Sequence, residues 1–508
     1  MTPDDSGSTT TAPRAAELAP GPGAATRLPA PFPSPLRWGP LGALVMRPWY
    51  DRMAVHVVAH WYLVLSRAWA AALESEGDEA RFAAALGLDA LPNGLCGWRL
   101  RRGLAEATKL AKVHAGADAH WHDVFFGRGL GGVTPSDAAL VAAEEARRAA
   151  SHNLMAARRH FTCIRRQIAT VRWALPRPED MPPLESLTGD AGTCIRYPAG
   201  PAAFPVALPG ALPAVEQSHA VPGPFGRQSW IRFPSPGLPG DTAWARVIEP
   251  EGVANPPTLI SLHGICMESE HWGRAMDSVD ITPALALKGL RVILPEGPWH
   301  GRRRVPGTYG GEPAMAQGPL GFLKLFQAWG AEVAVLIDWA RRRSNGGEGN
   351  SGQRGPRIAI GGVSLGALTS QLAAVAANEW PAALRPDALM LVACSGSLKE
   401  VAFEGSLANA LGLPAELAAQ GWQEADIERY LPLMEPRRAP VMAPDKLVMT
   451  LGDADDLTPF SGGLALARRW QVPPANLFLR HQGHFSVAFD LARRPQPLDR
   501  LVEILKAG

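Results

Sequence analysis

Three polar side chains in the last third of the chain have the types and the order needed for nucleophilic catalysis. Ser364 stands in a G-x-S-x-G pattern at 362–366, and Asp455 and His484 follow it. A serine hydroxyl is a poor nucleophile near neutral pH unless an imidazole takes its proton, and the imidazole needs a carboxylate to orient it. We therefore interpret Ser364 as a nucleophile, His484 as its base and Asp455 as the orienting acid.

The residues around Ser364 predict a sharp turn from a strand into a helix. The β-branched run 358–360 ends in glycines, and the helix-favouring run 367–378 follows. In such a turn the serine is exposed at the tip, and side chains two residues away must be absent because neighbouring backbones crowd the strained turn. The start of the helix favours negative charge at the same point. The alternative is a glycine-rich turn with a solvated serine.

The acid and the base each have alternatives in the sequence. Asp453, Asp455 and Asp456 all follow a predicted strand at 447–451, and His481 and His484 both follow a short strand at 477–479. Asp455 is preferred over Asp456 and Asp453, and His484 over His481. The competing interpretation for either histidine is a surface loop.

Strands alternate with helices through the second half of the chain. A hairpin is predicted from strands at 230–233 and 242–248, and a buried strand at 257–264 follows it. Further apolar strands, at 292–295, 358–360, 388–394, 446–451 and 476–479, are separated by helical segments. Alternation of this kind indicates a mostly parallel sheet covered by helices.

On these motifs the chain from about Trp230 onward resembles the α/β-hydrolase superfamily. The motifs are 262–264 after an early strand, the pattern at 362–366, and the paired signals Gly452-x-x-Asp455 and Gly483-His484. In the family pattern the acid lies three residues after the glycine and four before a proline, and Asp455 fits both spacings. The resemblance implies the α/β class: a doubly wound, mostly parallel sheet with a helical cap insertion at about 397–440. With its helical N-terminal extension, the chain looks most like a poorly characterised abhydrolase-domain branch.

The resemblance also implies the groups around the nucleophile. The backbone N–H of Leu365 and that of Ile265 or Cys266 are expected to form an oxyanion hole, and the Cys266 thiol to line the pocket. Residues expected to bind substrate are His263, Gly264, Trp299, His300 and Arg302. The guanidinium of Arg302 fits either a grip on an anionic substrate group or a structural ion pair.

The first part of the chain has a different character. We predict a disordered N-terminus at 1–35, a helical region at 36–175, a Pro/Gly-rich linker at 176–226 and the hydrolase domain at 227–508. Helices are expected at 48–73, 77–88, 100–115 and 136–175. The apolar spacing of 48–73 favours a helix buried on its domain, while its Trp and Tyr content leaves an interfacial helix and peripheral membrane contact open.

The composition narrows the class of protein. The chain has 508 residues with a formal net charge of +2, so nothing in the overall charge indicates nucleic-acid binding. Its five cysteines are scattered without C-x-x-C spacing, which argues against a disulfide scaffold or a metal site and predicts a cytoplasmic protein. No cofactor is implied, and the oligomeric state stays open.

Together these features predict a serine hydrolase that cleaves a carboxylic ester, esterase- or lipase-like, through an acyl-enzyme. The expected substrate is a small-molecule or lipid ester. One alternative is an acyltransferase that uses the same three residues with another acceptor. The other is a catalytically inactive hydrolase fold that serves as a binding or membrane-associated module.

Overall fold

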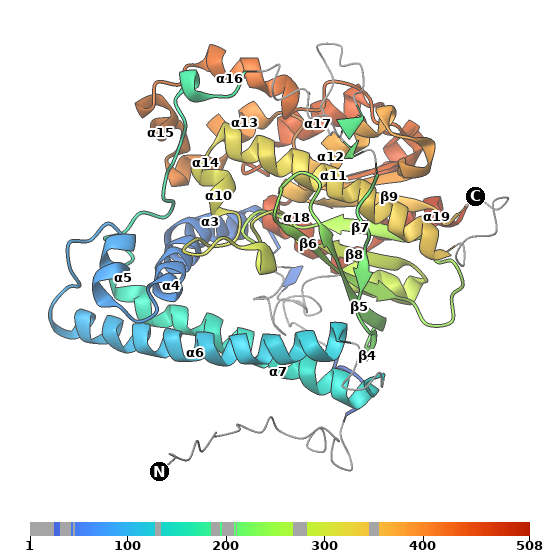
Figure 1. Ribbon diagram of the computed structural model, residues 1–508. Helices are drawn as coiled ribbons and strands as arrows, with labels where there is room; N and C mark the ends of the chain where they lie inside the picture. Colours follow the sequence, from blue (N-terminus) through green and yellow to red (C-terminus); the bar gives the residue numbers. More distant parts are fainter. Residues whose placement is uncertain are drawn as a thin grey trace, which may run out of the picture.

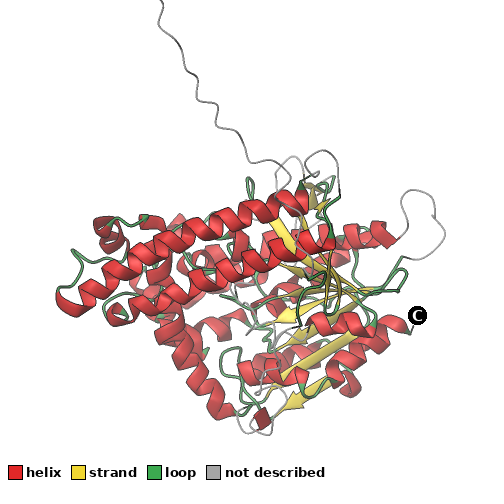
Figure 2. Cartoon of the chain, turned by 90° about the horizontal axis from the view of Figure 1, so that it is seen from below, coloured by secondary structure: helices red, strands yellow, loops and turns green. Residues whose placement is uncertain are grey.

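The computed structural model describes residues 25–30, 42–43, 46–127, 134–183, 194–195, 208–209, 211–267, 282–344 and 355–507. A large sheet carries helices on both faces, a group of N-terminal helices lies beside it, and short helices form a cap (Figure 1). In the view of Figure 2 two long N-terminal helices run side by side next to the sheet.

The main sheet has ten strands in the order β12-β11-β10-β9-β7-β8-β6-β5-β3, with β4 also paired to β5. In chain order they are β3 (Glu216–Gln217), β4 (Val221–Gly223), β5 (Gly226–Pro234), β6 (Thr242–Glu249), β7 (Thr258–Leu262), β8 (Arg291–Pro295), β9 (Ile358–Val363), β10 (Ala388–Val392), β11 (Leu447–Gly452) and β12 (Leu477–Arg480). The predicted hairpin is confirmed as the antiparallel pair β5–β6.

The strand order reverses beside β7. β7 pairs in parallel with both β8 and β9, so the chain crosses over β7 on its way from β8 to β9. The strands from β9 to β12 are parallel to their neighbours. In open α/β sheets such a reversal creates a crevice at the carboxyl ends of the strands, where ligands bind. The crevice here lies at the ends of β7 and β9.

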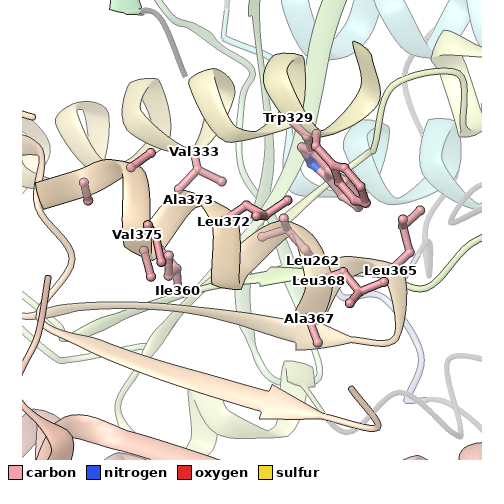
Figure 3. Packing of buried hydrophobic residues seen from close by; sticks show 14 of the residues in the cluster. Leu262, Trp329, Val333, Ile360, Leu365, Ala367, Leu368, Leu372, Ala373 and Val375 are labelled. Atoms are coloured by element: carbon pink, nitrogen blue, oxygen red, sulfur yellow. The ribbon is translucent and has the colours of Figure 1, made fainter. Parts of the chain in front are cut away.

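Helices cover both faces of the sheet because its central strands are apolar on both sides. On β9, Ile358 and Ile360 pack in the core under α11 (Pro319–Ser344) and α12 (Leu365–Ala376), and Ala359 faces the other core. Figure 3 shows side chains of α11 and α12 packed over the sheet, with Trp329 near the end of β7. α17 (Phe460–Arg469) adds to the first face, and α18 (His484–Phe489) and α19 (Gln496–Lys506) cover the second.

α11 is the one described helix that could cross a membrane by length and composition. Most of its apolar side chains are buried in the core against the sheet. The length and apolar character of α11 are therefore explained by its place in the core of the domain.

The N-terminal helices form a core of their own. They are α3 (Pro48–Val57), the π-helical η2 (Val58–Tyr62), α4 (Leu63–Ser75), α5 (Glu79–Ala85), α6 (Gly94–Phe126), α7 (Asp137–Ala156) and η3 (Ala157–Ile164). Trp69, Phe82 and Phe161 are fully buried among them. The helix predicted at 100–115 is part of the much longer α6. The one predicted at 136–175 is α-helical only to Ala156 and continues in 3-10 geometry to Ile164.

The N-terminal helices pack directly against the main sheet. Trp121 of α6 meets Trp230 of β5 edge to face, with ring centroids 5.8 Å apart. Leu28 is buried in the same cluster, and its amide donates to the carbonyl of Pro222. The disorder predicted for 1–35 is thus wrong for 25–30, and the rest of that stretch lies outside the described residues. The predicted linker at 176–226 ends in β3 and β4, which pair with β5; most of its first half also lies outside the described residues.

A disulfide joins Cys96 of α6 to Cys163 of η3. The cysteine spacing argued against a disulfide scaffold and did not predict this single bridge, because folding brings together two thiols separated by 67 positions. Structural disulfides persist in oxidising surroundings. The cysteine argument for a reducing cytoplasm no longer supports that localisation.

The cap lies between β10 and β11, as the sequence predicts. Its helices are α13 (Leu398–Phe403), α14 (Ser406–Leu411), α15 (Leu413–Ala419) and α16 (Glu424–Tyr430). They stand over the end of the sheet at which β9 meets α12 (Figure 1).

Candidate active site

Ser364 occupies a strained turn between β9 and α12. Its backbone has φ 55° and ψ −121°, a conformation that side-chain-bearing residues rarely adopt. The amide of Ser364 donates to the carbonyl of Val392, and its carbonyl accepts from Leu368 at the start of α12. The neighbouring strand and the helix thus hold the turn in place from both sides.

Two glycines make this turn possible. A Cβ added to Gly366 would lie 2.2 Å from the carbonyl oxygen of Leu262, and one added to Gly362 would lie 2.3 Å from the same atom. No real Cβ approaches an oxygen so closely. The steric reason predicted for the glycines therefore holds, and the crowding group is the last residue of β7.

Asp455 and His484 are joined by a buried hydrogen bond. Nδ1 of His484 lies 2.9 Å from Oδ2 of Asp455. The hydroxyl of Thr458 donates to the same carboxylate oxygen at 2.8 Å, and the amides of Leu457 and Thr458 donate to the other. Four donors therefore hold this carboxylate as an acceptor, which sets the tautomer of His484 with its proton on Nδ1.

The alternatives to these residues are engaged elsewhere. Asp456 accepts a hydrogen bond from the hydroxyl of Ser406 at the start of α14. Asp453 lies 3.1 Å from the exposed ring of His481, outside the buried site. Of the three acids and two histidines considered from the sequence, the buried pair is Asp455 with His484.

Thr458 connects the surroundings of the serine to those of the histidine. Thr458 lies 3.1 Å from Nδ1 of His484 and lines the same cavity as Ser364. In the described part of the chain the hydroxyl of Ser364 makes no hydrogen bond to His484. Hydrogen bonds between catalytic groups are often long in the free enzyme and tighten when substrate binds.

Two backbone amides near Ser364 are available for an oxyanion. A Cβ on Gly264 would lie 3.4 Å from Cβ of Ser364, so the loop after β7 runs directly beside the serine. Ile265 and Leu365 line the cavity with Ser364. Neither of their amides donates a hydrogen bond within the described residues, and that of Leu365 opens α12.

The oxyanion role predicted for Cys266 as an alternative is wrong. Its amide donates to Nε2 of His300 at 3.2 Å, and its carbonyl accepts from the hydroxyl of Tyr62 at 3.2 Å. Burial raises the pKa of the Cys266 thiol, so the thiolate is strongly disfavoured. The two backbone hydrogen bonds of Cys266 therefore hold the loop after β7 in place.

His263 and His300 hold this loop and do not line the cavity with Ser364. Nε2 of His263 accepts from the amide of Gly297, and Nδ1 lies 2.8 Å from the carbonyl of Gly264. Desolvation lowers the pKa of His263 to about 4, and Arg303 adds to the shift. Desolvation, with His263 nearby, also lowers the pKa of His300. Both rings are thus neutral supports, not the substrate contacts predicted from the sequence.

Trp299 and Arg302 also lie away from the cavity. Trp299 packs against the core of the sheet with φ 63°. Arg302 pairs with Asp118 of α6 at 3.0 Å, and its guanidinium lies 4.3 Å from the ring centroid of Trp121. The structural ion pair considered for Arg302 is therefore the arrangement found, and it fastens α6 to the domain that carries the main sheet.

The cavity beside Ser364 is almost entirely apolar. It has a volume of about 120 Å³ and is roofed by the cap. Leu407 and Leu411 of α14 and Ile427 of α16 face Phe322 of α11 and Trp173 across it. Such a lining favours a hydrocarbon group and offers few polar contacts beyond those at the serine.

The helix that carries His484 is held by a carboxylate from the N-terminal region, which the sequence analysis missed. Oδ1 of Asp51 accepts from the amides of Phe485 and Ser486 at 2.6 and 3.0 Å. Oδ2 accepts from the amide of Gly483 at 3.2 Å and from the hydroxyl of Ser486 at 2.5 Å. A carboxylate at a helix N-terminus satisfies the unpaired amides and complements the helix dipole.

The close approach of Asp51 also explains a glycine. A Cβ on Gly483 would lie 2.5 Å from Cγ of Asp51, whereas the φ of Gly483, −94°, suits any residue. The partners are 432 positions apart, so no local signal could have revealed them. The one hint in the sequence is a single acid in an otherwise basic and apolar stretch.

Among the described residues no group of three or more His, Cys, Asp and Glu side chains is arranged to hold a metal ion.

Comparison with protein-family models finds no match, and no curated protein matches. Solved structures are similar over the C-terminal part of the chain. Acetyl Xylan Esterase 1 from Thermoanaerobacterium sp. JW/SL YS485 is 18% identical, with 58% of this chain and 89% of that chain covered and a TM-score of 0.40. An S-formylglutathione hydrolase from Agrobacterium tumefaciens is 15% identical, with 56% and 98% covered and a TM-score of 0.35. These likenesses carry no argument about activity. The predicted fold class, a mostly parallel sheet with a cap and a helical N-terminal region, is confirmed.

Proposed function

We propose that this protein is a serine hydrolase that cleaves carboxylic esters with an apolar acyl or alcohol group. The observation that carries the proposal is the buried Asp455–His484 hydrogen bond at the crevice where the strained Ser364 turn opens onto an apolar cavity. A surface loop histidine or a solvated serine would need neither arrangement.

In the proposed mechanism Ser364 attacks the ester carbonyl while Nε2 of His484 takes its proton. Asp455 keeps the other ring nitrogen protonated and stabilises the imidazolium. The amides of Leu365 and Ile265 stabilise the tetrahedral oxyanion, each contributing about 3–4 kcal/mol. His484 then protonates the leaving alcohol, and water, activated by the same ring, releases the acid from the acyl-enzyme.

A fluorophosphonate probe tests the activated serine, because only an activated hydroxyl reacts with it. We expect labelling of the wild type and none of Ser364→Ala, with Ser370→Ala, a buried serine of α12, as the matched control that stays labelled. Unlabelled, folded wild type would instead support the inactive binding module. Labelling that persists in Ser364→Ala would identify another nucleophile.

Hydrolysis of p-nitrophenyl esters of increasing acyl length tests the apolar cavity. We expect kcat/KM to rise from acetate towards medium-length chains, because each buried methylene contributes about 0.8 kcal/mol. A preference for acetate would contradict the role of the cavity. Adding alcohol acceptors and analysing the products separates hydrolysis from acyl transfer.

A further inference from the structure

The outer face of α3 carries an apolar stripe. Trp49, Met53, Val57 and Trp61 follow one another at four-residue spacing along α3 and η2, and they are 52, 48, 45 and 38% exposed. The positions two residues further on, Asp51, Val55, Ala59 and Leu63, are all buried. The helix is therefore apolar on both sides: the inner side packs on the domain and the outer side faces solvent.

A chain of contacts links the stripe to the start of α6. The guanidinium of Arg165 lies 3.6 Å from the ring centroid of Trp61, and two residues before it Cys163 is bonded to Cys96. Leu95 and Trp98, on either side of Cys96, are 72 and 55% exposed. We call the six apolar residues the docking face: Trp49, Met53, Val57, Trp61, Leu95 and Trp98.

The docking face stands out from the rest of the described surface. It holds six of the eleven large apolar side chains that are exposed, and all three of the exposed tryptophans. Single exposed apolar residues are ordinary, but a cluster that gathers the tryptophans marks an interaction site.

The charges around the docking face are mostly positive, although Arg101 pairs with Glu79, and Arg159 and His160 pair with Glu106. The three segments that form and flank it, 46–62, 94–105 and 157–172, contain one carboxylate, Asp51, which is turned inward onto α18. The exposed arginines of these segments are Arg47, Arg52, Arg99, Arg101, Arg102, Arg159, Arg166 and Arg172. At the Trp49 end, a cavity of about 320 Å³ is lined by Arg47, Arg493 and Arg494, and also by Asp490, which pairs with the last two.

We propose that the docking face binds the surface of an anionic lipid bilayer, with its aromatic side chains among the headgroups and its arginines on the phosphates. Tryptophan and arginine side chains are typical of proteins at the membrane interface. The amphipathic indole ring lies at the level of the headgroups, and the guanidinium cation contacts anionic headgroups. A second copy of the chain would bring the same cationic surface against itself, which disfavours self-association. The proposal does not depend on catalysis, because no residue of the docking face belongs to the proposed reaction centre.

The site and the docking face share one helix. Asp51 holds the N-terminus of the His484 helix from the inner side of α3, within two residues of Trp49 and Met53. A protein docked in this way would work on esters close to the bilayer surface.

Co-sedimentation with vesicles tests the proposal on the full chain. We expect wild type to sediment with vesicles that contain a third of phosphatidylglycerol, and to bind pure phosphatidylcholine at least about tenfold more weakly, because each basic side chain near an anionic surface contributes about 1 kcal/mol. Trp49→Ser/Trp61→Ser should lose about tenfold or more in binding to the anionic vesicles. The matched control, Leu287→Ser/Leu479→Ser, removes two exposed apolar residues elsewhere and should bind like wild type.

Three results would overturn the proposal. If the wild type stays in the supernatant with anionic vesicles, the proposal is refuted. Equal binding by the tryptophan variant, with its fold verified by circular dichroism, would place the contact elsewhere. A wild-type dimer that becomes monomeric in the tryptophan variant would assign the face to a second copy. Ser364→Ala should bind vesicles like wild type, so a failure of the catalytic proposal is distinguishable from a failure of this one.

Discussion

The Asp51 carboxylate is the contact whose removal tests most directly how the N-terminal region supports the proposed reaction centre. It accepts four hydrogen bonds from Gly483, Phe485 and Ser486, and His484 lies between these residues at the first position of α18. Replacing Asp51 with Asn keeps the volume and removes the charge. Because the new amide nitrogen faces donors, the backbone around His484 has to shift.

The expected sizes follow from these contacts. Hydrogen bonds to a charged group contribute about 1.5–3 kcal/mol, so Asp51→Asn should lower the free energy of unfolding by about 2 kcal/mol. Asp51→Ala, which leaves buried donors without an acceptor, should lower it by about 3–5 kcal/mol. A displacement of about 1 Å in a catalytic group costs on the order of a hundredfold in rate. We therefore expect kcat of Asp51→Asn to fall about 10–100-fold, with KM changed less than about threefold, since Asp51 does not line the cavity.

The assay is ester hydrolysis well below the unfolding midpoint, with active sites counted by fluorophosphonate labelling and stability measured by urea unfolding. Asp78 offers a matched control, because its carboxylate accepts from the amide of Arg81 at the start of α5, an exposed helix end. Asp78→Asn should change stability by less than about 0.5 kcal/mol at unchanged kcat, because asparagine and aspartate cap helices about equally well. If Asp51→Asn loses stability but keeps kcat within threefold of wild type, Asp51 supports the fold alone and the positioning argument is refuted.

Three further predictions concern the turn, the supporting histidines and the cavity. Gly366→Ala places a Cβ 2.2 Å from the carbonyl of Leu262, so urea unfolding should show a loss of about 3 kcal/mol or more; an unchanged midpoint would contradict the crowding. The pKa of His263 is lowered from 6.5 to about 4 in the folded state, so the folded protein favours the neutral ring. The stability from this preference is complete above about pH 6.5, and about 3 kcal/mol is lost as the pH falls towards 4. A urea midpoint that does not change between pH 7 and 4 would refute this. Ala408→Trp fills the cavity and should shift the preferred p-nitrophenyl ester to shorter acyl chains without loss of fluorophosphonate labelling; an unchanged length profile would show that the acyl group binds elsewhere.

Much of the fold and of the site was predicted from sequence patterns that span only a few positions. The alternation of apolar strands with helices was enough to predict the sheet, and the glycines at 362 and 366 were enough to predict the turn at Ser364, because both depend on neighbours within a few positions. That an acid after β11 and a histidine after β12 would lie close together followed from strand ends that meet at one edge of a parallel sheet.

The errors arose where a side chain had two plausible partners. Arg302 and His300 follow a core strand near the site, and the sequence could not distinguish a contact with substrate from a contact with protein. The structure brings Asp118 to Arg302 and the amide of Cys266 to His300. Both partners are distant in the chain, so the choice was made by packing.

The sequence by itself determined the local conformations: which residues form strands, which turn is strained and which serine it presents. These follow from side-chain shape, spacing and backbone sterics. Only the tertiary structure decided which of the three acids meets the imidazole, that Asp51 supports the histidine's helix, and that one face of α3 is left in solvent with its tryptophans. Those outcomes depend on contacts between groups distant in the chain, 29 positions apart for Asp455 and His484 and 432 for Asp51 and Gly483, which the order of residues does not encode locally.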